Sequence, residues 1–219
     1  MSIFSTDSKL YRFMVRFWDL VKLNMIWMLC SLPIVTFGIS TIAACSVTLK
    51  MSEDREGKVV HDFFREFKRN WKQGLPMSFI TIISAWAVYL DFQLVGAAEE
   101  HRILFIIVGA VAAYILGFAH LYVYPLLARY QNSILGSLKN SFEISMRFFG
   151  RSILLVIVLL IEVCLIIWNP TTLFVGFLVG PAVIMYTISG VGINIFRELE
   201  KRPETIVDRS AEELDESQQ

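Results

Sequence analysis

The sequence predicts an all-α protein, a polytopic transmembrane helix bundle of about five spans. Hydrophobic residues make up 55% of the 219 residues, and the mean hydropathy is +0.57. Soluble domains are only about 45 to 50% apolar, so this excess indicates a lipid environment. The apolar residues also form long, continuous runs. Such runs favour helices, because membrane strands are short, alternate in polarity and close into a barrel.

Each apolar run approaches the roughly 20 residues that a helix needs to cross the bilayer core. The predicted spans are residues 23–49, 75–98, 103–128, 152–168 and 171–196. Together they place residues 1–196 in a single transmembrane domain. Residues 197–219 are rich in charged side chains and contain no aromatic residue. We expect them to form a charged tail that is partly disordered.

The first apolar run allows two arrangements. Residues 23–49 would extend about 40 Å as one helix, which is longer than the bilayer core. Pro33 and Gly38 interrupt the run. It either crosses the membrane once as a kinked, tilted helix or folds back at Pro33 as a re-entrant hairpin.

Basic residues gather in three segments between or beyond the spans. Residues 50–74 contain seven Lys and Arg residues, residues 128–151 contain four, and the C-terminal tail contains four, whereas the two remaining connectors contain only Arg102. The positive-inside rule therefore predicts that these three segments, and so the C-terminus, are cytoplasmic. The basic N-terminal arm would lie outside if residues 23–49 cross once, and inside if they form a hairpin.

Three segments have the periodicity of amphipathic helices, at residues 8–20, 62–74 and 137–151. Basic amphipathic helices lie in the headgroup layer or dock to a partner, and anchoring to lipid is the simpler role. The segment at 62–74 is the candidate docking helix. Its apolar residues are Phe63, Phe64, Phe67 and Trp71, and its basic residues are Arg65, Lys68, Arg69 and Lys72.

Glu162 is the candidate polar site within the membrane. A helix that starts near Ser152 reaches it after roughly 15 Å, at about the bilayer midplane. A central Asp costs about 2.5 to 3.5 kcal/mol to insert, so Glu162 should be protonated, paired or in contact with water. Tyr114 and Ser84 have comparable depth and are the candidate partners. A neutral acid that closes one interhelical hydrogen bond is the commoner arrangement, and a proton or cation relay is the alternative.

Small residues mark two candidate packing sites. Gly109, Ala113 and Gly117 follow a small-xxx-small pattern, and Gly176 and Gly180 form a G-x-x-x-G pair. Both patterns are typical of close helix packing. The partner helix can belong to the same chain or to a second copy, so a homo-oligomer stays open.

Motifs for enzymatic chemistry are missing from the sequence. We find no phosphate-binding loop, no H-E-x-x-H and no G-x-S-x-G, and the three histidines and three cysteines are widely scattered. We therefore expect no enzyme activity, no cofactor and no metal site. The formal net charge of zero predicts no nucleic-acid partner.

The N-terminal third carries a family resemblance. The residues concerned are Asn24, Trp27, Ser31, Leu32, Pro33, Thr36 and Gly38, then Glu56, Gly57, Phe63, Phe64, Phe67, Lys68, Asn70 and Trp71. This pattern resembles the YesL-like family of uncharacterised bacterial integral membrane proteins. The resemblance implies a multi-pass protein of the bacterial plasma membrane, of a kind often encoded beside ABC-type carbohydrate uptake systems. No functional residues are established for this family, so the resemblance assigns none to this chain.

The sequence supports two main functional hypotheses. The first is a non-enzymatic accessory or regulatory protein of a carbohydrate transport system, with the lipid bilayer and ABC transporter subunits as partners. The second is a small transporter or channel that uses Glu162. An intramembrane enzyme is the weakest hypothesis, because no pair of nucleophile and base is present.

Overall fold

The computed structural model describes residues 9–55, 57–97, 102–130 and 132–201. No strand occurs among them, which confirms the all-α prediction. In chain order the elements are α1 (Lys9–Ser31), the short 3-10 helix η1 (Ile34–Thr36), α2 (Phe37–Ser52), α3 (Val59–Arg69), α4 (Trp71–Ala97), α5 (Arg102–Leu121), α6 (Val123–Arg129), α7 (Ile134–Arg147), α8 (Phe149–Ile167) and α9 (Pro170–Glu200).

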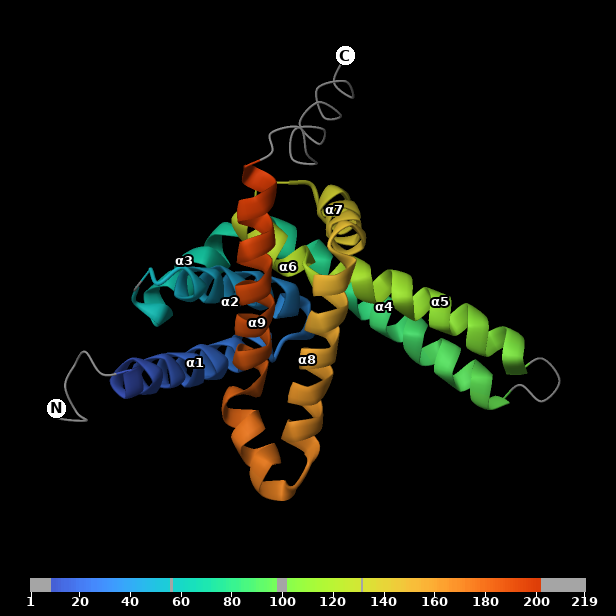
Figure 1. The fold of residues 1–219 in the computed structure, drawn as a ribbon, viewed down its shortest axis with the longest axis horizontal. Helices are drawn as coiled ribbons and strands as arrows, with labels where there is room; N and C mark the ends of the chain where they lie inside the picture. The colour runs from blue at the N-terminus through green and yellow to red at the C-terminus, as the bar shows by residue number, and fades with distance from the viewer. Residues whose placement is uncertain (1–8, 56, 98–101, 131, 202–219) are drawn as a thin grey trace, which may run out of the picture.

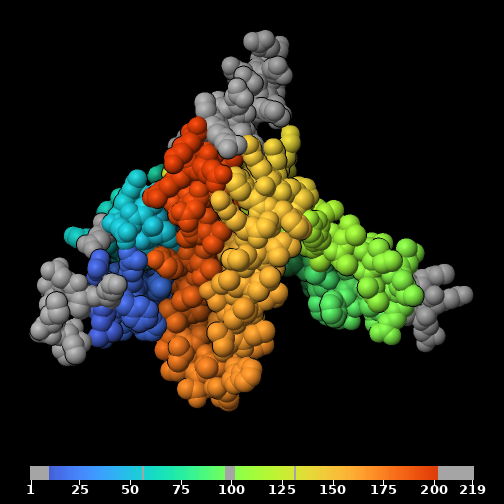
Figure 2. Space-filling view, viewed as in Figure 1, coloured from blue at the N-terminus to red at the C-terminus, as the bar shows by residue number. Residues whose placement is uncertain are grey.

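Helix α1, the pair α4–α5 and the pair α8–α9 extend in three directions from the centre of the molecule (Figure 1). Three pairs of consecutive long helices are in contact, namely α1 with α2, α4 with α5, and α8 with α9. Helix α2 lies at the centre, because it also packs against α3, α4, α6 and α9. Figure 2 shows that the α8–α9 arm and the α4–α5 arm are separate over their outer lengths.

Five segments of the described residues are long and apolar enough to cross a membrane, which confirms the predicted class. They are residues 34–52, 71–96, 102–129, 149–167 and 170–200.

Helices α1 and α2 lie antiparallel, as in the hairpin arrangement. Pro33 lacks a backbone N–H and disfavours helical geometry at the residue before it, so α1 ends at Ser31. The Thr36 hydroxyl donates to the carbonyl oxygens of Cys30 and Pro33 and closes the turn. Beyond the turn, Trp27 Nε1 donates to Thr41 Oγ1 over 3.1 Å. The predicted run at 23–49 is thus two helices, and the predicted amphipathic segment at 8–20 continues into the first of them; residue 8 lies outside the described residues.

Helices α2 and α4 cross where two glycines meet. A Cβ atom on Gly38 would overlap the carbonyl oxygen of Gly74, and a Cβ on Gly74 would overlap the backbone of Ile39. Ser78 Oγ accepts from the N–H of Gly38 over 2.7 Å and donates to the carbonyl of Gly74 over 3.0 Å. This hydroxyl therefore satisfies one of the unpaired N–H groups in the first turn of α2.

Helix α9 is tied to α1 at its proline. Pro181 cannot donate to the carbonyl of Phe177, four residues earlier. The side chain of Asn24, which is fully buried, donates to that carbonyl over 2.9 Å. A buried carbonyl without a partner would be costly in lipid, so this bond fixes α1 against α9.

The other predicted boundaries need correction. The predicted span at 103–128 consists of α5 and α6, which are interrupted at Tyr122. The amphipathic segment predicted at 137–151 is α7, which ends at Arg147, and α8 begins before the predicted span at 152–168. Helix α9 continues to Glu200, beyond the predicted end at residue 196. Residues 202–219 of the predicted tail lie outside the described residues.

Candidate functional site

Glu162 is paired with a different residue from those predicted. Thr187 Oγ1 of α9 donates to Glu162 Oε1 over 2.6 Å. The second carboxylate oxygen, Oε2, is buried and has no hydrogen-bond partner. Tyr114 and Ser84 belong to the α4–α5 arm, which diverges from the α8–α9 arm (Figure 1). Depth along each helix could not show which helices are neighbours.

The two glycine patterns differ in their packing. Gly176 and Gly180 face the side chain of Ile166 in α8, so this pair packs within the chain. Gly109 lies against Asp91 of α4. Ala113 and Gly117 are exposed, and no atom lies within 4 Å of a Cβ placed on Gly117. The second half of the predicted ridge on α5 is therefore not an internal packing site.

The predicted docking helix is shorter than expected. Helix α3 ends at Arg69, and the Asn70 side chain caps it by donating to the carbonyl of Glu66 over 2.9 Å. Trp71 and Lys72 consequently begin α4. This break redirects the chain into the long apolar helix.

Only part of the apolar side of α3 is available to a partner. Phe63 is fully buried, and Phe67 is partly buried against the core. Phe64 and Trp71 are 43% and 54% exposed. The basic side chains of the candidate docking helix are exposed. These exposed residues, which we call the α3–α4 corner, are Phe64, Arg65, Lys68, Arg69, Trp71 and Lys72.

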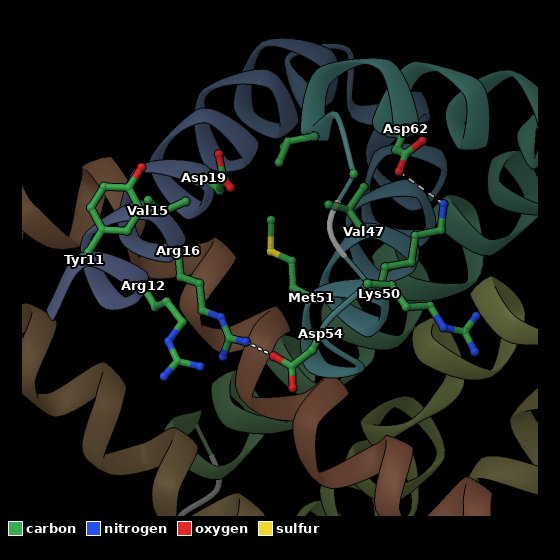
Figure 3. A pocket seen from close by; sticks show the side chains of 13 residues that line it. Tyr11, Arg12, Val15, Arg16, Asp19, Val47, Lys50, Met51, Asp54 and Asp62 are labelled. Atoms are coloured by element: carbon green, nitrogen blue, oxygen red, sulfur yellow. Dashed lines mark hydrogen bonds and ion pairs between the residues drawn. The ribbon is translucent and has the colours of Figure 1, made fainter. Parts of the chain in front are cut away.

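A pocket of about 680 Å³ lies between the first half of α1, the end of α2 and the start of α3 (Figure 3). We call it the α1–α2 pocket. Its basic lining residues are Arg12, Arg16, Lys50 and Arg55, its acidic ones are Asp19, Asp54 and Asp62, and its apolar ones include Val15, Val47, Met51 and Val59.

Ion pairs join the walls of this pocket. Arg16 of α1 pairs with Asp54, and Lys50 Nζ of α2 lies 3.4 Å from Asp62 Oδ2 of α3. Asp54 lies just after the end of α2 and has a φ of 54°. This is the left-handed region, which Asp tolerates better than most residues. Since Arg16 precedes Pro33 and Asp54 follows it, their pairing is also consistent with two helices that run antiparallel.

A second charged cluster connects three helix ends. Arg129 at the end of α6 donates to Glu53 over 3.1 Å and to Glu200 of α9 over 3.0 Å. Tyr130 donates to Glu200 Oε1 over 2.6 Å. Burial and the hydrogen bond to Glu200 raise the pKa of Tyr130, so the phenol keeps the proton that it donates. The cluster holds the ends of α2, α6 and α9 together.

Sequence reasoning missed the α1–α2 pocket as a site. The signal was present in the basic N-terminal arm, which conflicts with a single first crossing. The conflict shows that these residues belong near the loop at 50–74. It does not show that α1, α2 and α3 enclose a cavity there.

Metal ligands do not cluster within the part of the chain that the structure describes. No group of three or more His, Cys, Asp or Glu residues there is placed to hold a metal ion. Among the described cysteines, Cys45 is buried, Cys30 is partly buried and Cys164 is exposed, and none forms a disulfide.

The five apolar segments and the helical fold define the class as a helical membrane protein. The profile of a family described as "Protein of unknown function, DUF624" matches residues 20–92, from the middle of α1 into α4. The chain is also 24% identical over 208 residues to "Uncharacterized protein YesL" of Bacillus subtilis (strain 168), covering 93% of this chain and 97% of that protein. Together these matches support the resemblance of the chain to the YesL-like family. No solved structure matches it.

Proposed function

We propose that the chain is a non-enzymatic accessory protein of an ABC-type carbohydrate transport system in the bacterial plasma membrane. The YesL-like resemblance supports the transport context. The observation that carries the docking role is the α3–α4 corner, where Phe64 and Trp71 remain exposed beside four basic side chains. Exposed aromatic residues among arginines are typical of the centres of protein interfaces.

The membrane arrangement that we propose follows from the three helix pairs. Arg16 meets Asp54, Arg129 meets Glu53 and Glu200, and Arg151 meets Glu198, so the basic helix ends of all three pairs lie at one end of the molecule. The positive-inside rule assigns this end to the cytoplasm. The α1–α2 hairpin is then re-entrant, and both the N-terminal arm and the end of α9 are cytoplasmic.

The α3–α4 corner lies on the cytoplasmic side in this arrangement. A transporter's cytoplasmic subunits or loops are therefore within its reach. Phe63 and Phe67 anchor α3 to the core, which leaves Phe64 and Trp71 on a supported surface instead of a free helix. Support of this kind lowers the entropy cost of binding.

Co-purification in mild detergent from the native membranes tests this proposal. Wild-type protein should recover transporter subunits in stoichiometric amount. In the double variant Phe64→Ser, Trp71→Ser, the amount of recovered subunits should fall at least about ten-fold, since interface anchors often contribute about 2 kcal/mol or more. Leu135→Ser is the matched control, because Leu135 of α7 is 76% exposed and lies outside the corner. Recovery of the protein without any transporter subunit would contradict the proposal.

A second candidate function is transport of a proton or cation through Glu162. The observation that favours it is the buried, unpaired Oε2 atom beside the bond to Thr187. Ionisable groups inside a membrane often mark ion pathways. Flux into liposomes that is lost in Glu162→Gln but retained in Thr187→Val would support transport, whereas equal flux with and without the protein would exclude it.

A further inference from the structure

We propose that the α1–α2 pocket binds the phosphate headgroup of an anionic phospholipid from the cytoplasmic leaflet. The inference rests on the proposed membrane arrangement, but it does not depend on a transporter partner. The volume of the α1–α2 pocket, about 680 Å³, falls in the range of about 300 to 1,000 Å³ that is typical of small-molecule sites.

The charge of the pocket favours an anion. Four basic and three acidic side chains line it. The acids are already engaged, because Asp54 pairs with Arg16, Asp62 with Lys50, and Asp19 with Lys22 outside the pocket. Arg12 is exposed, and no carboxylate within the described residues pairs with it. A phosphate would give Arg12 a charge-assisted partner.

Arg12 and Arg16 are placed to act together. They are four residues apart on α1 and therefore project from the same face of the helix. Figure 3 shows both guanidinium groups extending from α1 on the side of Asp54. Arg55 also lines the pocket but is already paired with Glu53 over 3.2 Å, so Arg12 and Arg16 are the residues that we expect to hold the phosphate.

The apolar part of the pocket fits a lipid better than free phosphate. Met51 points into the middle of the pocket from α2 (Figure 3), and Val15, Val47 and Val59 complete its apolar lining. These side chains can cover the glycerol backbone and the first methylene groups of the acyl chains. A soluble phosphate would leave this surface in contact with water.

Exposed aromatic residues of α1 place the pocket at the membrane surface. Phe13 is 66% exposed, and Trp18 is 60% exposed. Exposed aromatic residues on a basic helix are typical of insertion at the headgroup level. The pocket, which α1 also lines, is then beside the lipid headgroups, so its occupant can enter from the leaflet.

Thermal unfolding of the full chain, purified in a neutral detergent and washed free of lipid, tests the site. Phosphatidylglycerol should raise Tm by about 5 °C more than phosphatidylcholine with the same acyl chains. The difference should shrink at high salt. Arg12→Gln should lose at least half of it, and Arg147→Gln, which changes an exposed arginine on α7, should retain it.

A second variant separates the pocket from simple surface charge. Val15→Trp fills the pocket at a position that is 42% exposed, so folding should persist while the phosphatidylglycerol effect disappears. An equal effect of glycerol phosphate or inorganic phosphate would overturn the lipid assignment and identify a soluble phosphate as the ligand. Equal shifts from both phospholipids, or a full effect in both Arg12→Gln and Val15→Trp, would overturn the site itself.

Discussion

Asn24 shows how one residue of the family pattern can determine a helix contact. Its amide donates to the carbonyl that Pro181 leaves unpaired in α9. Other residues of that pattern have comparable roles, since Thr36 closes the turn and Trp27 bonds across it. Part of the pattern that carries the resemblance is therefore a set of side chains that builds the α1–α2 hairpin and attaches it to the bundle.

We predict that Asn24→Leu destabilises the fold by about 1 to 3 kcal/mol, because it leaves the Phe177 carbonyl without its donor. In a Pro181→Ala background, the restored N–H can bond to Phe177, so the same substitution should cost less. Urea or thermal unfolding of the four proteins of this cycle measures the coupling. Equal costs in both backgrounds would show that Asn24 acts elsewhere.

At the scale of the element, close approach decides how the helices cross. Helices α2 and α4 touch through backbone at Gly38 and Gly74, and α8 meets α9 where Ile166 covers Gly176. Small residues matter in this way because helices in lipid associate through packing and hydrogen bonds and not through a hydrophobic driving force. The spacing of Gly176 and Gly180 predicted such a contact, whereas Gly38 and Gly74 are far apart in sequence and could not be matched.

Gly38→Ala should therefore reduce the yield of folded protein and lower stability by about 1 to 3 kcal/mol, the usual cost of overpacking. The matched control is Gly117→Ala, since nothing lies within 4 Å of a Cβ at that position. Its stability should equal or exceed that of the wild type, because alanine favours helix. Size-exclusion chromatography and thermal unfolding in detergent compare the two variants.

At the scale of the whole molecule, the charged clusters and the helix ends that they join lie at the same end. The Arg129 cluster joins α2, α6 and α9, and the Arg16–Asp54 pair closes the hairpin nearby. The apolar arms extend away from this end (Figure 1). In the membrane arrangement that we propose, three returning helix pairs place both ends of the chain on one side of the membrane.

Reporter fusions test that arrangement. We expect a fluorescent protein to mature in the cytoplasm when it is fused to either end of the chain, and alkaline phosphatase to be inactive at both. A fusion after residue 169, in the turn between α8 and α9, should show the reverse pattern. Opposite results at the two ends would require an odd number of crossings and would restore the single kinked first span.

The sequence by itself determined the helical membrane class, the apolar segments and the basic character of one set of connectors. These properties depend on how each segment interacts with lipid and water, so they can be inferred from composition and periodicity. Only the tertiary structure decided that Glu162 meets Thr187, that Phe63 is buried, and that Arg12 and Arg16 share a pocket with Lys50. Those facts depend on which helices are neighbours, and in lipid a few contacts between residues distant in sequence, such as Gly38 with Gly74, decide that.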